Sequence, residues 1–459
     1  MTRQKIPLLP LVLLILRSLP PVYGRDLPTA AIEDDSGLRL SIRDSWLLDA
    51  PDRVLARPSA LRVLPGGGQV QIRTETIPGE FAVILARELT GPQGQSMGSF
   101  PGWAQGSWVY ARRRDNGAPL RIRVFLRSDS RTYIQFRPLG EDRSLMDMIL
   151  YDACLAWSLP VPLPFNRLLT MPMETVYAAL GEKFNRRYFD PDPDNYQDLR
   201  LFVSRLRSRL PELSYRDDGA FDSQGRYVFI ETQEPQDDPP GLNCSGFAKW
   251  VVDGILRPRT GRRLDIGPLK QPFGSRGSSF TDVWEDLRDP FFGLDWTRNL
   301  ASQAWTILRS PSYAGLEDIE VRDIPFSQLI LRGQNAVRAP APGPALKNYP
   351  GKLENSGFDI EGLRPILYTL AVDEPGRLYL ASINTEMGAP TTADNLRGLP
   401  RIRQHFHIAV LAPFFDEYGG FQVAVFESAV ETRFARFLAR YPGCQVNLVR
   451  LPVEGPFDP

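Results

Sequence analysis

Cysteine and histidine are scarce in this chain, and their positions limit where nucleophilic chemistry can occur. The 459 residues contain three cysteines and only two histidines, His405 and His407. Both histidines lie in the segment R-Q-H-F-H-I-A-V-L, which is typical of a strand, and Cys244 lies in G-L-N-C-S-G-F-A-K-W-V-V, which is typical of a helix start. A thiol at a helix start and an imidazole on a later strand are the minimal set for thiol-based acyl chemistry.

The residues around Cys244 predict a helix whose first turn contains the thiol. Asn243 is a favoured N-cap residue, and apolar residues then recur at the spacing of one helix face: Phe247, Trp250, Val251 and Ile255. The free N–H groups and the dipole of a first turn favour an anion and lower a thiol pKa. Ser245 and Gly246 are small, so a substrate could approach. The alternative is a buried cysteine that only starts a core helix.

The histidine strand is expected to form a hairpin with the segment that follows it. Asp416–Gly420 supplies the turn and Phe421–Ser428 the return strand. If the hairpin is symmetric about residue 417, paired positions sum to 834, and His407 faces Glu427 at about 5 Å between Cβ atoms. A carboxylate there would hold the imidazole in the tautomer that accepts the thiol proton. The alternative is that both histidines are ordinary strand residues.

The other polar clusters do not predict a metal or a cofactor. His405, His407 and Cys244 could ligate zinc, but no fourth ligand is evident. The four aspartates between residues 190 and 198 lack the glycine and the final glutamate of a calcium loop, and two prolines interrupt them. Phosphate-binding loops, dinucleotide fingerprints and serine-hydrolase elbows are also missing from the sequence. We therefore expect no metal and no cofactor.

The first part of the chain predicts β-structure. Residues 25–140 contain alternating apolar and polar runs at Gln69–Arg73 and Leu120–Leu126, separated by turn-forming glycines. This pattern favours an antiparallel sandwich or barrel. Residues 141–225 are expected to be a helical connecting region, with a buried helix over Ser144–Trp157 and an amphipathic helix over Leu199–Leu210.

Residues 226–459 are expected to form the catalytic domain. Tyr227–Ile230 predicts a short strand, and Leu378–Ala381 predicts another. Because 163 residues (407 − 244) separate Cys244 from His407, a large insertion over about 256–400 is expected, with helices near 280–289 and 296–309. The overall expectation is an α+β fold.

The N-terminal residues 1–24 resemble a signal peptide. A positive start at Arg3 and Lys5 precedes an apolar run over Ile6–Leu16 that is too short to span a bilayer comfortably. This predicts a secreted or periplasmic protein with no transmembrane domain in the mature chain; an uncleaved N-terminal anchor is the alternative.

Cys154 and Cys444 either pair or are buried as small apolar residues, and the second is preferred. Equal numbers of basic and acidic residues, 54 each, argue against nucleic-acid binding.

Two motifs together resemble the NlpC-type cell-wall cysteine peptidases, a superfamily with a papain-like fold. N-C-S-G-F-A-K-W-V resembles their helix start, and H-I-A-V-L followed by V-A-V-F-E-S resembles their histidine hairpin. The resemblance implies Cys244 as nucleophile, His407 as base and Glu427 as orienting residue, and it makes the upstream Tyr227 a candidate for substrate contact. Ser245, small and next to the thiol, is the other candidate for substrate contact. Asn243 replaces the family's usual aspartate, and glutamate is a variant third residue.

The expected function is therefore an exported thiol hydrolase that cleaves an amide bond. The favoured substrate is a peptidoglycan stem peptide; another envelope amide or ester remains open. One alternative is a non-catalytic envelope-binding protein on a decayed peptidase scaffold, and another is a cysteine acyltransferase or thioesterase.

Overall fold

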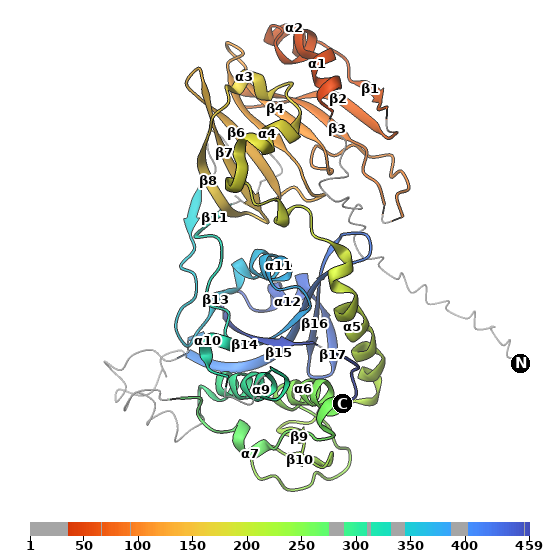
Figure 1. Ribbon diagram of the computed structural model, residues 1–459, viewed down its shortest axis with the longest axis vertical. Coiled ribbons are helices and arrows are strands. Elements are labelled where there is room, and N and C mark those ends of the chain that lie inside the picture. The colour runs from red at the N-terminus through yellow and green to blue at the C-terminus, as the bar shows by residue number, and fades with distance from the viewer. Residues whose placement is uncertain are drawn as a thin grey trace, which may run out of the picture.

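The structure is a computed structural model that describes residues 35–65, 67–91, 93–274, 289–309, 314–331, 345–386, 403–453 and 455–459. The predicted signal peptide, residues 1–24, and most of the predicted helix near 280–289 lie outside these ranges. An antiparallel sheet occupies one end of the molecule, and a smaller sheet flanked by helices occupies the other (Figure 1). The α+β class with a large antiparallel sheet is confirmed.

The large sheet has ten strands: eight follow one another as an antiparallel meander, and two late strands extend it at the far edge. The first eight are β1 (Ala60–Val63), β2 (Gln69–Ile77), β3 (Glu80–Arg87), β4 (Trp108–Arg113), β5 (Pro119–Val124), β6 (Tyr133–Leu139), β7 (Arg143–Leu150) and β8 (Ala153–Val161). The late strands are β11 (Gln328–Ile330) and β12 (Leu346–Asn348). Short helices cover this unit: α1 (Ser36–Ser41), α2 (Pro51–Leu55), α3 (Phe165–Leu168) and α4 (Met173–Leu180).

The helix expected over Ser144–Trp157 is wrong, because these residues form most of β7 and β8. Asp147 does not cap a helix. It is fully buried and accepts hydrogen bonds from Arg137 on the neighbouring strand, at 2.8 Å from Nη2 to Oδ1. The last five residues of β7 are all buried. A strand buried on both faces loses the apolar–polar alternation by which strands are recognised, so its sequence resembles that of a buried helix.

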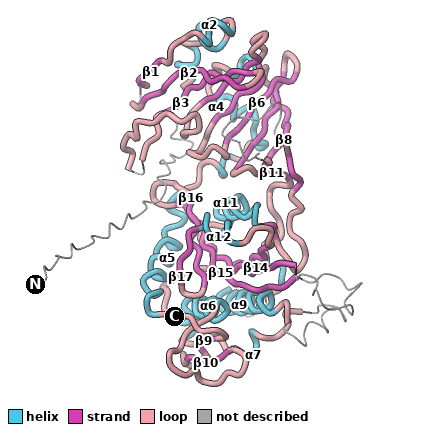
Figure 2. Tube along the Cα trace, turned by 180° about the vertical axis from the view of Figure 1, so that it is seen from behind, coloured by secondary structure: helices cyan, strands magenta, loops and turns pink. Residues whose placement is uncertain are grey.

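The six-stranded sheet of the second unit has the order β13-β18-β14-β15-β16-β17. Its strands are β13 (Phe358–Asp359), β14 (Arg377–Glu386), β15 (Arg403–Phe415), β16 (Phe421–Glu427), β17 (Val430–Arg433) and β18 (Gln445–Pro452). Helices α6 (Cys244–Thr260) and α9 (Phe292–Arg309) lie along one face, while α11 (Leu363–Asp373) and α12 (Phe434–Arg440) lie along the other (Figures 1 and 2). Side chains alternate accordingly: Leu380 and Val410 pack with α6 and α9, and Tyr379 and Leu411 pack with α11 and α12.

The described part of the segment 256–400 belongs to both units. After α7 (Ile266–Leu269), α9 and α10 (Leu316–Ile319), the chain returns to the ten-stranded sheet, where Leu329 of β11 pairs with Ala153 of β8. It then enters the six-stranded sheet as β13 and, after α11, as the central strand β14. This segment therefore does more than cover a site: it joins the two sheets and completes the second one.

Two smaller elements lead into the second unit. The amphipathic helix expected over Leu199–Leu210 is confirmed as α5 (Gln197–Arg209), which buries Leu199, Phe202, Val203 and Leu206. A two-stranded sheet, β9 (Gly219–Phe221) and β10 (Tyr227–Phe229), then precedes α6 and packs against it. Among the helices in the described ranges, none is long and apolar enough to cross a bilayer.

Candidate active site

Helix α6 begins at Cys244, as its sequence predicts. Asn243 has an extended backbone, and its side-chain oxygen accepts a hydrogen bond from the Gly246 N–H at 2.8 Å. This cap satisfies one of the N–H groups that a helix start leaves open. Cys244 is therefore the first residue of the helix, half-buried and with a free thiol.

Strand β9 holds the start of α6 in place at very short range. The Asn243 N–H donates to the Gly219 carbonyl at 3.0 Å. A Cβ added to Gly246 would lie 1.9 Å from that same carbonyl oxygen, which no side chain can tolerate. Glycine at position 246 is thus required for the helix start to approach β9, and this contact fixes the position of the thiol.

His407 lies on β15 between the thiol and a carboxylate. It acts on Cys244, since each of the two side chains shifts the pKa of the other, and its Nε2 lies 2.9 Å from Glu427 Oε1. A carboxylate can only accept, so Nε2 carries the proton and Nδ1 is the ring nitrogen left for the thiol. The three residues Cys244, His407 and Glu427, predicted from separate motifs, are brought together, with His407 hydrogen bonded to Glu427 and coupled to the thiol of Cys244.

The hairpin register differs from the symmetric one expected from sequence. Val410 pairs with Phe426 and Phe415 with Phe421, so paired positions sum to 836 and not to 834. The shift is two residues. Because side chains alternate with a period of two, a shift of two keeps His407 and Glu427 on the same face and still within reach diagonally.

Glu427 is a buried acceptor for several donors. Besides His407, its oxygens accept from Arg440 Nη1 at 3.0 and 3.1 Å and from the Tyr441 hydroxyl at 3.1 Å, and the Thr432 hydroxyl also donates to it. Only 4% of its surface is exposed. Burial alone would raise the pKa of Glu427, but these donors and the charges of His407 and Arg440 lower it below its usual value. Glu427 is thus held as an anion.

The thiol and the imidazole shift each other's pKa in opposite directions. Burial acts to lower the pKa of His407, but hydrogen bonds to Cys244 and Glu427 outweigh it and raise the pKa from 6.5 to about 9. Burial likewise acts to raise the pKa of Cys244, but the hydrogen bond and charge of His407, the Ile408 N–H and the Ser245 hydroxyl lower it. Both shifts favour the charged forms, thiolate and imidazolium, and the thiolate is the reactive form of a thiol nucleophile.

The two residues expected to contact substrate lie at different distances from the chemistry. Ser245 adjoins the thiol and is buried, with its carbonyl accepting from the Trp296 indole at 2.9 Å. Tyr227 stacks on Phe221 at 4.3 Å between ring centres in the β9–β10 sheet. Burial and the charges of Asp217 and Cys244 raise the pKa of Tyr215, which is 64% exposed. Sequence reasoning missed Tyr215, since only its pairing with Leu242, just before the N-cap, brings it near.

His405 belongs to a separate network. Its Nδ1 lies 2.8 Å from the Ser382 hydroxyl and its Nε2 lies 2.9 Å from the Asn355 carbonyl. Strand β14 pairs Ile383 with His407 but Asn384 with His405, so Phe406 is an extra bulged residue between the two histidines. The bulge lets neighbouring histidines serve different surroundings. Of the two, His407 is the one that contacts the thiol.

The remaining cysteines are distant from this chemistry. Cys154 on β8 and Cys444 before β18 are both buried and both free, as the preferred interpretation expected. Burial raises the pKa of the Cys154 thiol to about 12 and also raises that of Cys444. Cys244 is the single cysteine whose pKa is lowered, so a thiol reagent should discriminate among the three.

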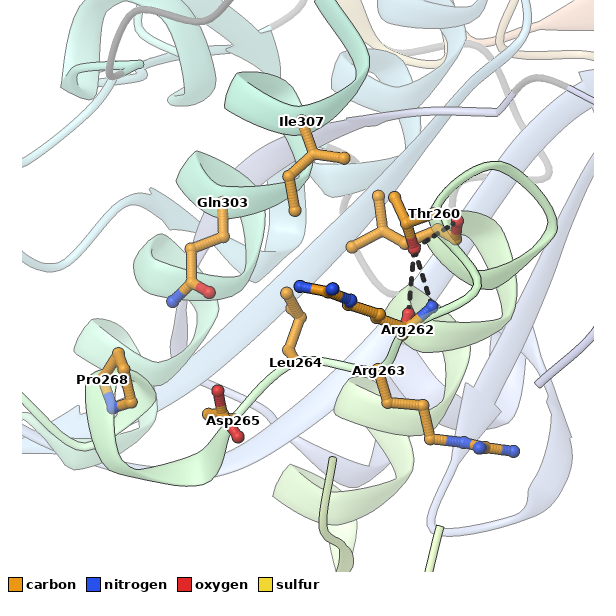
Figure 3. A pocket seen from close by; sticks show the side chains of 9 residues that line it. Thr260, Arg262, Arg263, Leu264, Asp265, Pro268, Gln303 and Ile307 are labelled. Carbon is orange, nitrogen blue, oxygen red and sulfur yellow. Dashed lines mark hydrogen bonds between the residues drawn. The ribbon is translucent and has the colours of Figure 1, made fainter. Parts of the chain in front are cut away.

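The far end of α6 forms a pocket of about 440 Å³ that is unrelated to the thiol. It is lined by Thr260, Arg262 and Leu264 from the helix end and by Gln303 and Ile307 from α9 (Figure 3). At 1.5 Å rise per residue, Thr260 lies about 24 Å from Cys244 along the helix. This pocket is therefore remote from Cys244.

Comparison with known proteins bears on the first part of the chain only. A family model described as a domain of unknown function (DUF8515) matches residues 28–188, which include strands β1 to β8 but neither Cys244 nor His407. No curated protein and no solved structure matches the chain. The site is accordingly interpreted from its own geometry.

Proposed function

We propose that this protein is a thiol hydrolase that acts through Cys244, His407 and Glu427. The observation that carries the proposal is the placement of His407 between a thiol at the start of a helix and a buried carboxylate, to which its Nε2 is hydrogen bonded. The order and roles match those of papain-like peptidases of the NlpC type, with glutamate as the third residue. An α+β domain in which a nucleophile helix packs on a sheet containing the histidine strand supports the same fold.

The mechanism follows from the protonation states. The Cys244 thiolate attacks the carbonyl carbon of an amide, and the oxygen develops a negative charge that the Cys244 backbone N–H helps to stabilise. The imidazolium of His407 gives its proton to the leaving amine as the C–N bond breaks, which leaves a thioester. Neutral His407 then takes a proton from water, whose oxygen displaces the thiolate and releases the acid. Glu427 keeps the imidazole oriented throughout and stabilises its protonated form before acylation and after water has given up its proton.

The favoured substrate is an amide in peptidoglycan stem peptides, and the favoured location is the periplasm or the cell exterior. The resemblance to cell-wall peptidases and the N-terminal sequence of residues 1–24 support this.

A second candidate is a cysteine acyltransferase or thioesterase. Two exposed rings near the dyad favour it: Tyr215 is 64% exposed and Phe406 is 42% exposed. The contact between Cys244 and His407 argues against the non-catalytic alternative, in which the two would lie apart.

The first experiment is iodoacetamide labelling across pH, with the modified cysteine mapped by mass spectrometry. We expect Cys244 to react well below the ordinary thiol pKa of about 8.5 and much faster than Cys154 and Cys444. The variant His407→Ala should lose this advantage. Slow labelling of Cys244 that is indifferent to His407 would contradict the proposal.

The second experiment identifies the bond. Purified stem tripeptides and tetrapeptides are incubated with the protein, and products are read by mass spectrometry beside Cys244→Ala. Cleavage that requires Cys244 supports the peptidase. A stable acyl group on Cys244 from an acyl ester, without stem cleavage, supports the acyltransferase. Cleavage that survives Cys244→Ala would refute the mechanism.

A further inference from the structure

A second pocket, of about 680 Å³, lies where the two units of the molecule meet. The ten-stranded sheet contributes Ser128, Asp129 and Tyr151 from its loops, and α5, α11, the β15–β16 hairpin, β17 and the start of α12 contribute the rest. Arg127 also joins the units here by donating to the Gly419 carbonyl at the tip of the β15–β16 hairpin. The volume lies within the range of pockets that bind small organic molecules, about 300–1,000 Å³.

One cation in this pocket is held between two aromatic rings. The Arg364 guanidinium carbon lies 4.9 Å from the centre of the Phe434 ring and 5.5 Å from that of Tyr151. Tyr151 in turn contacts Phe421 at 6.1 Å. Contact with ring faces restricts the orientation of a planar guanidinium, and its fork of N–H groups matches a carboxylate or a similar planar anion.

The charges of the lining favour a negative ligand. Three arginines, Arg207, Arg364 and Arg433, face two carboxylates, Asp129 and Glu431, which is a net charge of +1. Arg207 and Glu431 bind one another through two contacts of 2.7 and 2.6 Å. The rest of the lining includes three phenylalanines and a tyrosine, so an aromatic or acyl group is also accommodated.

We infer that this pocket between the two units binds a small organic anion, with its acidic group at Arg364 and its apolar part against Phe421 and Phe434. The site is separate from Cys244, and binding there does not depend on the proposed hydrolase activity.

The pocket also shares a wall with the candidate active site. Thr432 lines the pocket, and its hydroxyl donates to Glu427, the carboxylate that holds His407. An occupant that takes this hydroxyl as its own donor would remove one stabilising partner from Glu427. Bound ligand is then expected to change the reactivity of Cys244. This second step, unlike binding itself, rests on the proposed function.

Binding is tested with a fluorescent aromatic anion and its uncharged relative. The full chain is titrated with 1-anilinonaphthalene-8-sulfonate and, separately, with N-phenyl-1-naphthylamine, which lacks the sulfonate. We expect saturable binding that is stronger for the anion. Arg364→Met should raise the Kd of the anion roughly tenfold, about one lost charged contact. Equal affinity for both probes, or indifference to Arg364→Met, would overturn the inference.

A matched pair of variants on α12 locates the probe. Ala435 is exposed at the pocket wall, and Ala439 is exposed one turn further along without lining the pocket. Ala435→Trp should abolish the signal of the anion by filling the space, whereas Ala439→Trp should leave it unchanged. These changes are on the surface, so they remain informative if Arg364→Met fails to fold. Equal effects of both tryptophans would contradict binding at this site.

The coupling is read from the labelling rate of Cys244 with and without the anion. A rate that changes on saturation in wild type, but not in Ala435→Trp, supports coupling. If the labelling rate of Cys244 stays constant while the anion still binds, the coupling is refuted and the binding site in the pocket is retained. Slow labelling without any probe would instead count against the thiol dyad, so the two failures are distinguishable.

Discussion

At the scale of single residues, Glu427 controls how strongly the imidazolium and thiolate forms are stabilised. Glu427→Gln keeps a hydrogen-bond acceptor for His407 Nε2 but removes the negative charge. The pKa of His407 should then fall below about 9, and the pKa of Cys244 should rise because its partner is less often charged. We therefore expect the acid limb of the labelling profile to move up by roughly one to two pH units.

The direction of the shift in the labelling profile shows whether Glu427 stabilises the thiolate. Thiolate is the reactive form, so a lowered Cys244 pKa keeps labelling fast as pH falls through neutrality, and a raised pKa loses that reactivity first at low pH. Glu361→Gln is the matched control, because its carboxylate is exposed and pairs with Lys347 at 2.8 Å. A profile of Glu427→Gln that coincides with wild type would show that the carboxylate does not act on the dyad.

The positions of Cys244, His407 and Glu427 could each be predicted from neighbouring residues in the sequence. Asn243 and the apolar spacing that follows it predict the helix start, because capping and amphipathic periodicity depend only on neighbouring residues. The prediction that His407 meets Glu427 required only that both side chains lie on the same face of the hairpin. A two-residue difference in register keeps them on the same face. Tyr215 could not be predicted, since its approach to the site depends on a bridge to Leu242 across 27 positions.

At the scale of elements, the contact between α6 and β9 should be as important for reactivity as the dyad itself. Gly246→Ala would place a Cβ on the Gly219 carbonyl, so the helix start must move away from β9. We expect a loss of roughly 1–3 kcal/mol in the free energy of unfolding, typical of overpacking, and slower labelling of Cys244. Urea unfolding and iodoacetamide kinetics measure the two effects.

Gly267→Ala provides the control for this substitution. Gly267 lies in α7, has no neighbour within 4 Å of a new Cβ, and is not among the glycines with a positive φ. Its replacement should leave both measurements near wild type. If Gly246→Ala also behaves like wild type, the close approach of α6 to β9 does not determine the position of the thiol.

Elements buried on both faces were the hardest to predict. The run from Leu145 to Trp157 is apolar because β7 lies deep in a ten-stranded sheet, and apolar continuity alone does not distinguish a strand from a helix. The pairing of β11 with the ten-stranded sheet also could not be predicted from neighbouring residues in the sequence. Three residues with one pairing to β8 carry no signature in the sequence, yet they determine that the segment 256–400 joins two sheets.

At the scale of the whole molecule, the two sheets share one core. A single cluster of buried apolar side chains extends from Trp108 in the ten-stranded sheet to Trp296 on α9 and Val410 on β15. Elements that share buried contacts lose them together, so we expect one cooperative unfolding transition, although a chain of this size commonly unfolds in parts. Trp108→Phe and Trp296→Phe each remove one of the eight tryptophans, from the first and the second unit respectively, so each weights the fluorescence towards the other unit. The urea midpoint from each variant's fluorescence should coincide with its own midpoint from circular dichroism. Two midpoints within one variant would mean that the shared cluster does not couple the sheets.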